Sequence, residues 1–306
     1  MTEDRRALSA GLDQVEKYGA SSKIGRFIKK PMHYSLVILH RKIQYKFLGR
    51  EKQVKCKTFF NEEMHLSLPS STDIFLSGGK THDSEVRLAR YFISEVKAGE
   101  VFFDIGAHCG YFSLLASRLV GEEGSIVAFE ASPKTHQMLC QNLSQRSNAE
   151  IHHRAVSDTN GTVKFYEFPN LYSEYNAIDA EQYKDQNWFK KHRPVEANVQ
   201  AVTLDFFVRS HSIIPTTIKI DVEGAEYKVL SGSKNVLAKH SPTIAMEYLS
   251  PRRNNQNHVL ANNLLLDLGY SAHIIDSKGL LQKTRDLDEH MRTSGLESDN
   301  AVFKPA

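Results

Sequence analysis

Residues 101–130 read VFFDIGAHCGYFSLLASRLVGEEGSIVAFE. An apolar run rich in β-branched and aromatic residues ends at Asp104, a turn with Gly106 and Gly110 follows, and helical periodicity then continues to Leu119. A second apolar run ends at Glu130. This order predicts strand, tight loop, helix and strand, the unit that holds a nucleoside-bearing cofactor over the carboxyl edge of a parallel sheet.

Strands and helices alternate through the rest of the chain and predict an α/β fold with a doubly wound, mainly parallel sheet. The expected strands are 151–156, 161–168, 199–202, 216–221 and 242–247, and the expected helices are 84–96, 133–143, 203–210, 222–237 and 259–268. Segments 271–275, 280–283 and 301–304 predict an antiparallel C-terminal finish. We expect a Rossmann-like domain over 81–306, preceded by an N-terminal extension over 1–80 with helical patches and a hairpin at 58–76.

The composition fits a soluble globular protein, with 41% hydrophobic and 25% charged residues among 306. A net charge of +3 is too small to indicate a nucleic-acid partner. The three cysteines, Cys56, Cys109 and Cys140, are odd in number and far apart, which predicts neither a disulfide framework nor a zinc site. With no apolar signal segment at the N-terminus, these features predict a cytoplasmic protein.

The basic residues are concentrated near the N-terminus. Between Lys23 and Lys57, eleven Lys and Arg residues accompany one acid, Glu51. Ile28, Met32, Leu36 and Leu39 recur among them at helical spacing. This segment is either a solvated helix packed on the catalytic domain or a peripheral contact with an anionic membrane or a partner.

The loop after the first strand distinguishes between cofactors. A dinucleotide site uses G-x-G-x-x-G, whose second glycine lets the backbone touch a pyrophosphate, but His108 stands at that position here. Asp104 would add a negative charge beside a pyrophosphate, whereas S-adenosylmethionine (SAM) carries no phosphate and is cationic at its ammonium and sulfonium. Glu130 suits the ribose hydroxyls of either cofactor. The loop therefore favours SAM.

Two further acids lie at predicted strand ends. Asp221 ends a strand in IKIDVEGAEYKVL (Ile218–Leu230), and Glu247 ends the next strand in TIAMEYLSP. Either could act as a general base toward a hydroxyl, with His108 as another candidate. A divalent cation held by Asp221 and Glu247 is possible but not favoured, because two carboxylates make an incomplete metal site.

The segment 170–198 is polar and aromatic and is long for a connection inside a compact domain, which predicts a lid or a substrate surface. Its aromatic and basic side chains suit stacking on sugar rings and pairing with an acidic glycan, although a solvated surface loop fits the pattern equally well. They are Tyr172, Tyr175, Tyr183, Lys184, Trp188, Phe189, Lys190, Lys191, His192 and Arg193.

The chain resembles the FkbM family of SAM-dependent methyltransferases. The resemblance is carried by VFFDIGAHCGYFS (101–113), Glu130, RAVSD (154–158), IKIDVEGAEYKVLSG (218–232) and IAMEYL (244–249), and it spans roughly 81–270. It implies a class I methyltransferase fold and O-methylation of hydroxyls on sugars or natural products. The residues that it implies for cofactor binding are Asp104, Gly106, Ala107, Gly110, Tyr111, Glu130, Val156 and Asp158.

The expected function is therefore SAM-dependent O-methylation of a sugar, glycan or glycosylated metabolite, with Asp221, Glu247 and His108 as catalytic candidates and no metal. Two rivals remain open. One is an NAD-dependent sugar dehydrogenase or epimerase, disfavoured by the loop spacing and by the lack of a Tyr-x-x-x-Lys pair. The other is a cofactor-binding interaction module without activity.

Overall fold

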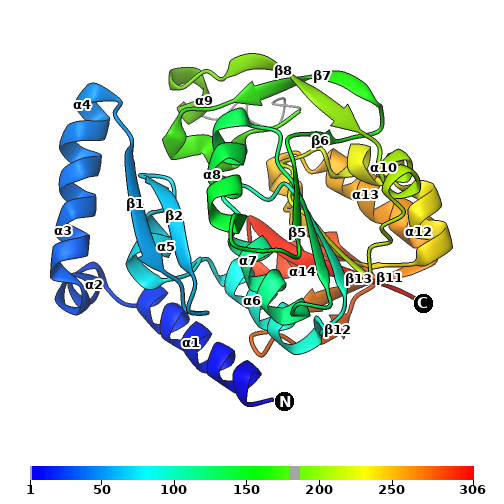
Figure 1. Ribbon diagram of the computed structural model, residues 1–306, viewed down its shortest axis with the longest axis horizontal. Helices are drawn as coiled ribbons and strands as arrows, with labels where there is room; N and C mark the ends of the chain where they lie inside the picture. Colours follow the sequence, from blue (N-terminus) through cyan, green and yellow to red (C-terminus); the bar gives the residue numbers. More distant parts are fainter. Residues whose placement is uncertain (1, 179–186) are drawn as a thin grey trace.

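The structure, a computed structural model, describes residues 2–178 and 187–306 and is centred on an eight-stranded sheet (Figure 1). Its strand order is β12-β11-β13-β10-β9-β3-β4-β5. The strands are β3 (Val101–Ile105), β4 (Ser125–Phe129), β5 (Ala149–His152), β9 (Thr217–Ile220), β10 (Thr243–Leu249), β11 (Tyr270–Ile275), β12 (Leu281–Lys283) and β13 (Ser298–Pro305). Strands β10, β9, β3, β4 and β5 are parallel, and β13, β11 and β12 pair antiparallel. The predicted fold class is confirmed.

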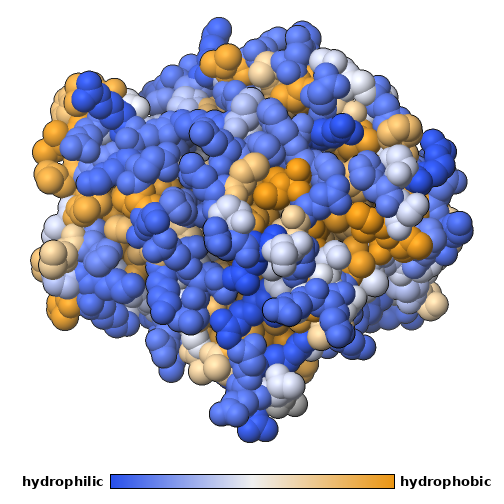
Figure 2. Space-filling view, viewed as in Figure 1, coloured by the Kyte–Doolittle hydropathy of each residue, from blue (hydrophilic) through white to orange (hydrophobic). Residues whose placement is uncertain are grey.

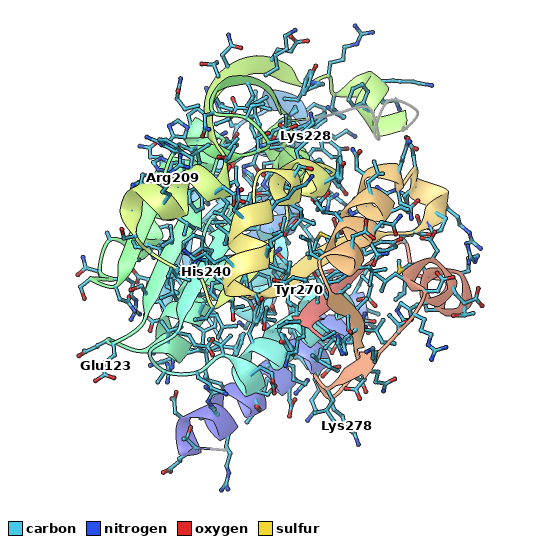
Figure 3. The ribbon with its side chains drawn as sticks, turned by 90° about the vertical axis from the view of Figure 1, so that its right-hand side faces the viewer. Glu123, Arg209, Lys228, His240, Tyr270 and Lys278 are labelled. Carbon is cyan, nitrogen blue, oxygen red and sulfur yellow. The ribbon has the colours of Figure 1, made fainter. Side chains whose placement is uncertain are left out.

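Alternate residues of each central strand enter two separate hydrophobic cores, one on each face of the sheet. Phe102 and Ile126 belong to the first core, whereas Phe103 and Val127 belong to the second. The first core is covered by α6 (Asp83–Glu95), α7 (Tyr111–Val120) and α8 (Pro133–Leu143). The second is covered by α10 (Leu204–His211), α11 (Glu226–Ser231), α12 (Lys234–His240), α13 (Gln256–Asp267) and α14 (Leu287–Ser294). Figure 3 faces this second layer, with Arg209 labelled on α10 and His240 at the end of α12.

Three predicted strands lie wholly or partly outside the main sheet. Strands β6 (Ala155–Val156), β7 (Gly161–Glu167) and β8 (Val195–Val202) form a separate three-stranded sheet in the order β6-β8-β7. Assigning 161–168 and 199–202 to the central sheet was therefore wrong, and only the start of 151–156 belongs to it. The physical reason is solvation, because most residues of β7 are exposed or half-buried, and a strand inside a sheet covered by helices on both faces would be buried throughout.

The expected single helix over 222–237 is also corrected. The backbone is left-handed at Glu223 (φ 55°) and Gly224 (φ 95°), so the helix begins only at Glu226. Ser233, with φ of −121°, then separates α11 from α12.

The N-terminal extension is built from short helices and one hairpin. They are α1 (Glu3–Gly19), α2 (Lys23–Lys29), α3 (Pro31–Leu39), the π-helical turn η1 (His40–Tyr45), α4 (Lys46–Leu48), β1 (Lys52–Lys57), β2 (Glu63–Leu68) and α5 (Thr72–Ser77). The expected hairpin at 58–76 is shifted, because 52–57 pairs with 63–68 and the later part of the segment forms α5. Leu8, Leu12 and Val15 of α1 are buried in the first core beside α6. No helix within 2–178 and 187–306 is long and apolar enough to cross a bilayer.

Candidate functional site

A cavity of about 370 Å³ lies at the carboxyl ends of β3, β4, β9 and β10. Ligands bind at this edge of an open parallel sheet, because the loops that follow the strands diverge there. The strand ends contribute Ile105, Gly106, Phe129, Glu130, Asp221 and Glu247. The N-terminal extension adds Asp73 and Lys80, so the cavity is formed by both parts of the chain.

The structure brings six of the eleven predicted site residues to this cavity. The lining residues among them are Gly106, His108, Glu130, Val156, Asp221 and Glu247. Asp104, Ala107, Gly110, Tyr111 and Asp158 do not line it, and Asp104 is completely buried. The roles assigned to all eleven residues stay predictions.

Gly106 has a structural reason to be glycine. Its φ is 78°, and a Cβ added there would lie 1.8 Å from the carbonyl oxygen of Asp221. The loop after β3 therefore touches the end of β9 directly. Glycine at this position keeps two parts of the cavity wall together.

Glu130 is held rigidly at the end of β4. Its Oε2 accepts from the His108 N–H and its Oε1 from the Ser132 N–H, both at 2.8 Å. Burial raises the pKa of Glu130 to about 7, although these N–H donors stabilise the carboxylate. Each oxygen keeps a second lone pair, so the carboxyl group can still accept from hydroxyls of a ligand.

A buried lysine connects two of the predicted acids. Lys219 is 3% exposed, and its Nζ lies 3.3 Å from Asp104 Oδ1 and 3.3 Å from Asp221 Oδ2. Ser113 donates to Asp104 Oδ2 at 2.6 Å. Burial alone would lower the pKa of Lys219, but the carboxylates of Asp104 and Asp221 outweigh it and raise that pKa. Asp104 therefore faces Lys219 and Ser113, and Lys219 fixes the side chain of Asp221.

Asp221 and Glu247 lie together but differ in protonation. Burial raises the pKa of Asp221, yet the ammonium groups of Lys219 and Lys80 outweigh burial, so the net shift is downward. Burial and the neighbouring Asp221 raise the pKa of Glu247 to about 8. At neutral pH the pair is therefore one carboxylate beside one carboxylic acid.

Glu223 joins this pair as a third acid. One carboxylate oxygen from each of Asp221, Glu223 and Glu247 lies within 4.8 Å of the others. Glu223 precedes α11 and lines the cavity. A cluster of carboxylates alone does not define a metal site.

His108 stands between the main cavity and a second one of about 300 Å³, and it lines both. Its Nε2 lies 3.3 Å from Ser173 Oγ. Burial and the positive charge of Lys80 lower the pKa of His108 to about 4. The imidazole is therefore neutral at physiological pH and is a weak base.

Sequence reasoning missed two lysines at the site, the buried Lys219 and the partly buried Lys80. Lys219 carried a usable signal, because a cation inside the apolar strand TIKI is rarely buried without an acidic partner. No sequence pattern indicates Lys80 as a site residue, because it follows a turn in the N-terminal extension. Its Nζ lies 3.2 Å from Glu85. Burial lowers the pKa of Lys80, but Glu85, Glu174 and Asp221 outweigh burial and raise it.

The segment 170–198 contributes to both cavities. Ser173, Glu174 and Tyr175, from the 3-10 helix η2 (Asn170–Tyr175), line the main cavity, and Arg193 lines the second. Lys190, Lys191 and His192 are exposed at or beyond the end of α9 (Asn187–Lys191). Tyr183, Lys184 and the side chain of Trp188 lie outside the described part of the chain.

Comparison with known proteins places these features in a family. Residues 104–272 match the family model described as the Methyltransferase FkbM domain. The chain is 24% identical over 155 residues to hexuronic acid methyltransferase AglP of Haloferax volcanii, covering 50% of this chain and 58% of the relative. It is 27% identical over 165 residues to methyltransferase sdnD of Sordaria araneosa, covering 46% and 63%. The chain thus spans less than two thirds of each relative.

Two solved structures align with the chain at low sequence identity. A crystal structure of methyltransferase FkbM from Methylobacillus flagellatus aligns at 17% identity with a TM-score of 0.44, covering 77% of this chain and 52% of that one. An O-methyltransferase from Bacillus cereus in complex with SAH aligns at 12% identity with a TM-score of 0.39, covering 71% and 78%.

The doubly wound sheet and the cavity at its carboxyl edge define a class I methyltransferase fold. The family match extends over more than half of the sequence. The chain belongs to the FkbM methyltransferase family, as its sequence motifs predicted.

Proposed function

We propose that this protein is a SAM-dependent O-methyltransferase that acts on a hydroxyl group of a sugar, glycan or glycosylated metabolite. One observation carries the proposal. A single cavity joins Gly106 and Glu130, where a nucleoside cofactor would lie, to Asp221 and Glu247, where an acceptor hydroxyl would be activated. Donor and acceptor groups would therefore share one cavity.

The polarity and charge of the cavity lining support SAM as the donor. Phe129, Val156, Phe165 and Ile178 offer an apolar surface for an adenine ring, and the Glu130 carboxyl can accept from ribose hydroxyls. Eight Asp and Glu residues line the cavity against three Lys and Arg residues, an excess that favours a cation. When bound, SAM supplies a strongly electrophilic methyl group.

Within this proposal, Glu247 removes the proton from the acceptor hydroxyl. A general base works best when its pKa lies near the working pH, and the pKa of Glu247 is about 8. Asp221, held by Lys219, stays ionised and keeps the pKa of Glu247 raised. Positioning of the two substrates supplies most of the rate enhancement, with effective molarities of ~10⁵ M or more.

Calorimetry with SAM, its demethylated product SAH, and NAD tests the donor. We expect SAM and SAH to bind and NAD not to bind. Glu130→Gln replaces a charged hydrogen-bond acceptor with a neutral one and should weaken SAM binding by about tenfold. Glu150→Gln, at a half-buried position on β5 that does not line the cavity, is the matched control and should bind SAM normally. Binding of NAD in place of SAM would restore the dehydrogenase alternative.

Transfer of labelled methyl from SAM to a panel of neutral sugars and hexuronic acids tests the acceptor. The panel includes hexuronic acids because that class is named for one relative. Methylation adds about fourteen mass units, one methylene, to the correct acceptor. Mass spectrometry of glycans and metabolites from a gene-deletion strain should show the corresponding loss. Tight SAM binding with no transfer to any cellular extract would favour the inactive binding module.

The proposal includes no metal. We expect dialysis against EDTA to leave the transfer rate unchanged. Loss of activity that Mg²⁺ restores would contradict this and would assign the cluster of Asp221, Glu223 and Glu247 to a cation.

A further inference from the structure

One edge of the molecule carries an unusual density of exposed apolar side chains. Nine of the fifteen large hydrophobic residues that are exposed in the described chain lie between residues 24 and 48. They are Ile24, Phe27, Ile28, Met32, Ile38, Leu39, Ile43, Phe47 and Leu48. Figure 2 shows hydrophobic residues along the left-hand edge, where Figure 1 places α3 and α4. We call this surface, residues 23–48, the basic apolar edge.

The apolar residues follow one side of a helical rod. Helix α3, turn η1 and helix α4 are continuous from residue 31 to residue 48. Met32, Leu39, Ile43 and Phe47 recur at intervals of seven, four and four residues, so they share a face. Met32 is 84% exposed and Phe47 is 74% exposed. The rod therefore presents an exposed apolar face that is turned away from the protein.

The opposite side of the rod is anchored to the protein. Val37 and His40 are buried, and His40 Nε2 lies 3.0 Å from the carbonyl oxygen of Arg50. Helix α3 packs against α5. The orientation of the exposed face is thus fixed by the fold.

The charge on the basic apolar edge has one sign. Eight Lys and Arg residues and no Asp or Glu lie between Tyr18 and Arg50. None of these eight cations forms an ion pair with a carboxylate in 2–178 or 187–306. Long basic side chains can reach outward while apolar neighbours enter a less polar phase. Uncompensated positive charge beside exposed apolar groups is the combination that binds an anionic lipid surface.

We propose that the basic apolar edge docks the protein on the surface of an anionic membrane. Other occupants fit less well. A second copy in a symmetric dimer would place two uncompensated basic surfaces against each other. A nucleic acid would pair with the cations but would leave Met32, Ile43 and Phe47 in water.

The docked edge is hydrogen-bonded to a wall of the main cavity. The Tyr45 hydroxyl accepts from the Leu171 N–H at 3.1 Å, and Leu171 belongs to η2. The neighbouring Asn170 accepts from the Ser70 N–H and donates to the Ser67 hydroxyl. The mouth of the cavity is thereby held at a fixed position relative to the membrane.

Flotation of the full chain with vesicles tests the proposal. We expect the protein to float with an equimolar mixture of phosphatidylglycerol and phosphatidylcholine, and about tenfold less with phosphatidylcholine alone. Raising NaCl to about 1 M, where the Debye length is ~3 Å, should release most of the bound protein. Absence of flotation with the anionic vesicles at low salt overturns the proposal.

A matched pair of triple variants locates the binding surface. Met32→Ser, Ile43→Ser and Phe47→Ser together should lower the bound fraction about tenfold. Ile214→Ser, Leu266→Ser and Leu280→Ser remove exposed apolar residues elsewhere and should leave it unchanged. Circular dichroism should show both variants folded. Equal binding by both overturns the proposal.

Light scattering separates membrane docking from self-association. We expect the wild-type chain and the variant at Met32, Ile43 and Phe47 to have the same mass in solution. A wild-type dimer that this variant converts to a monomer would overturn the proposal and assign the edge to a second copy.

Discussion

At the scale of single residues, Asp221 and Glu247 offer the sharpest test, because their pKa values are shifted in opposite directions. If Glu247 is the base, kcat rises with pH and levels off above about 8, where Glu247 is ionised. Glu247→Gln should remove this inflection and lower kcat on the order of 10²-fold or more. The pH profile of kcat with saturating SAM is the measurement.

Asp221→Asn provides the complementary result. Burial raises the pKa of Glu247 first and the Asp221 charge raises it further, so removing that charge should move the inflection to lower pH. Glu297→Gln, which alters an exposed acid at the mouth of the cavity, should leave the inflection in place. A wild-type profile that is flat between pH 6 and about 9 would exclude Glu247 as the base.

Substitution of Lys219 should cause a large loss of stability. Lys219→Met leaves Asp104 buried without its cation, and breaking a buried ion pair in this way costs about 3–5 kcal/mol. Urea denaturation measures this change. Combining Lys219→Met with Asp104→Asn should recover part of the loss. Equal loss of stability in the single and double variants would mean that the loss does not come from an unpaired Asp104.

At the scale of elements, substitution of Gly106 tests the close contact that the loop after β3 makes with β9. Gly106→Ala places a Cβ 1.8 Å from the Asp221 carbonyl, so it should destabilise the protein more than Gly99→Ala. Gly99 has nearly the same φ, 81°, but open space around it, so its alanine variant should lose only about 1–2 kcal/mol. Denaturation midpoints and SAM affinity measure the difference. Equal losses of stability in the two variants would show that the backbone at Asp221 moves to make room for the added Cβ.

The sequence predicts elements well where the signal is local. Strands β3 and β4 alternate between two cores and have an acid near their carboxyl ends, so both the strands and the edge at which they end could be predicted. The pairing of β7 with β8 could not, because the partners are separated by most of the segment 170–198. The late start of α11 depends on the backbone dihedrals at Glu223, and its split from α12 depends on those at Ser233, and residue type does not determine either.

At the scale of the whole molecule, α1 is part of the first core. Leu12 is completely buried there, so Leu12→Ala should cost about 2–5 kcal/mol. If residues 1–80 fold together with 81–306, urea denaturation stays a single transition at a lower midpoint. Leu260→Ala, at a half-exposed position on α13, is the control. A separate early transition would instead support an independent N-terminal domain, the division expected from sequence.

The candidate site, too, could be predicted from the sequence only in part. Glu130 and Asp221 follow strands and Glu247 lies near the carboxyl end of β10, so their meeting at one edge follows from the topology. Asp73 and Lys80 reach the cavity from the extension, and only the packing of α5 and the following turn brings them there. Contacts between distant segments depend on tertiary packing that local patterns do not encode.

The side sheet of β6, β7 and β8 has a separate small core of Ala155, Phe165, Val199 and Ala201. It is inserted between β5 and α10 and carries η2, which lines the main cavity. An insertion with its own core can change in length and sequence while the eight-stranded sheet keeps its packing. Val156 and Phe165 of this insertion belong to the proposed adenine surface, whereas η2 lines the other part of the cavity. A chimera that exchanges η2 (Asn170–Tyr175) and keeps Val156 and Phe165 therefore offers a way to change the acceptor preference while leaving the proposed adenine surface in place.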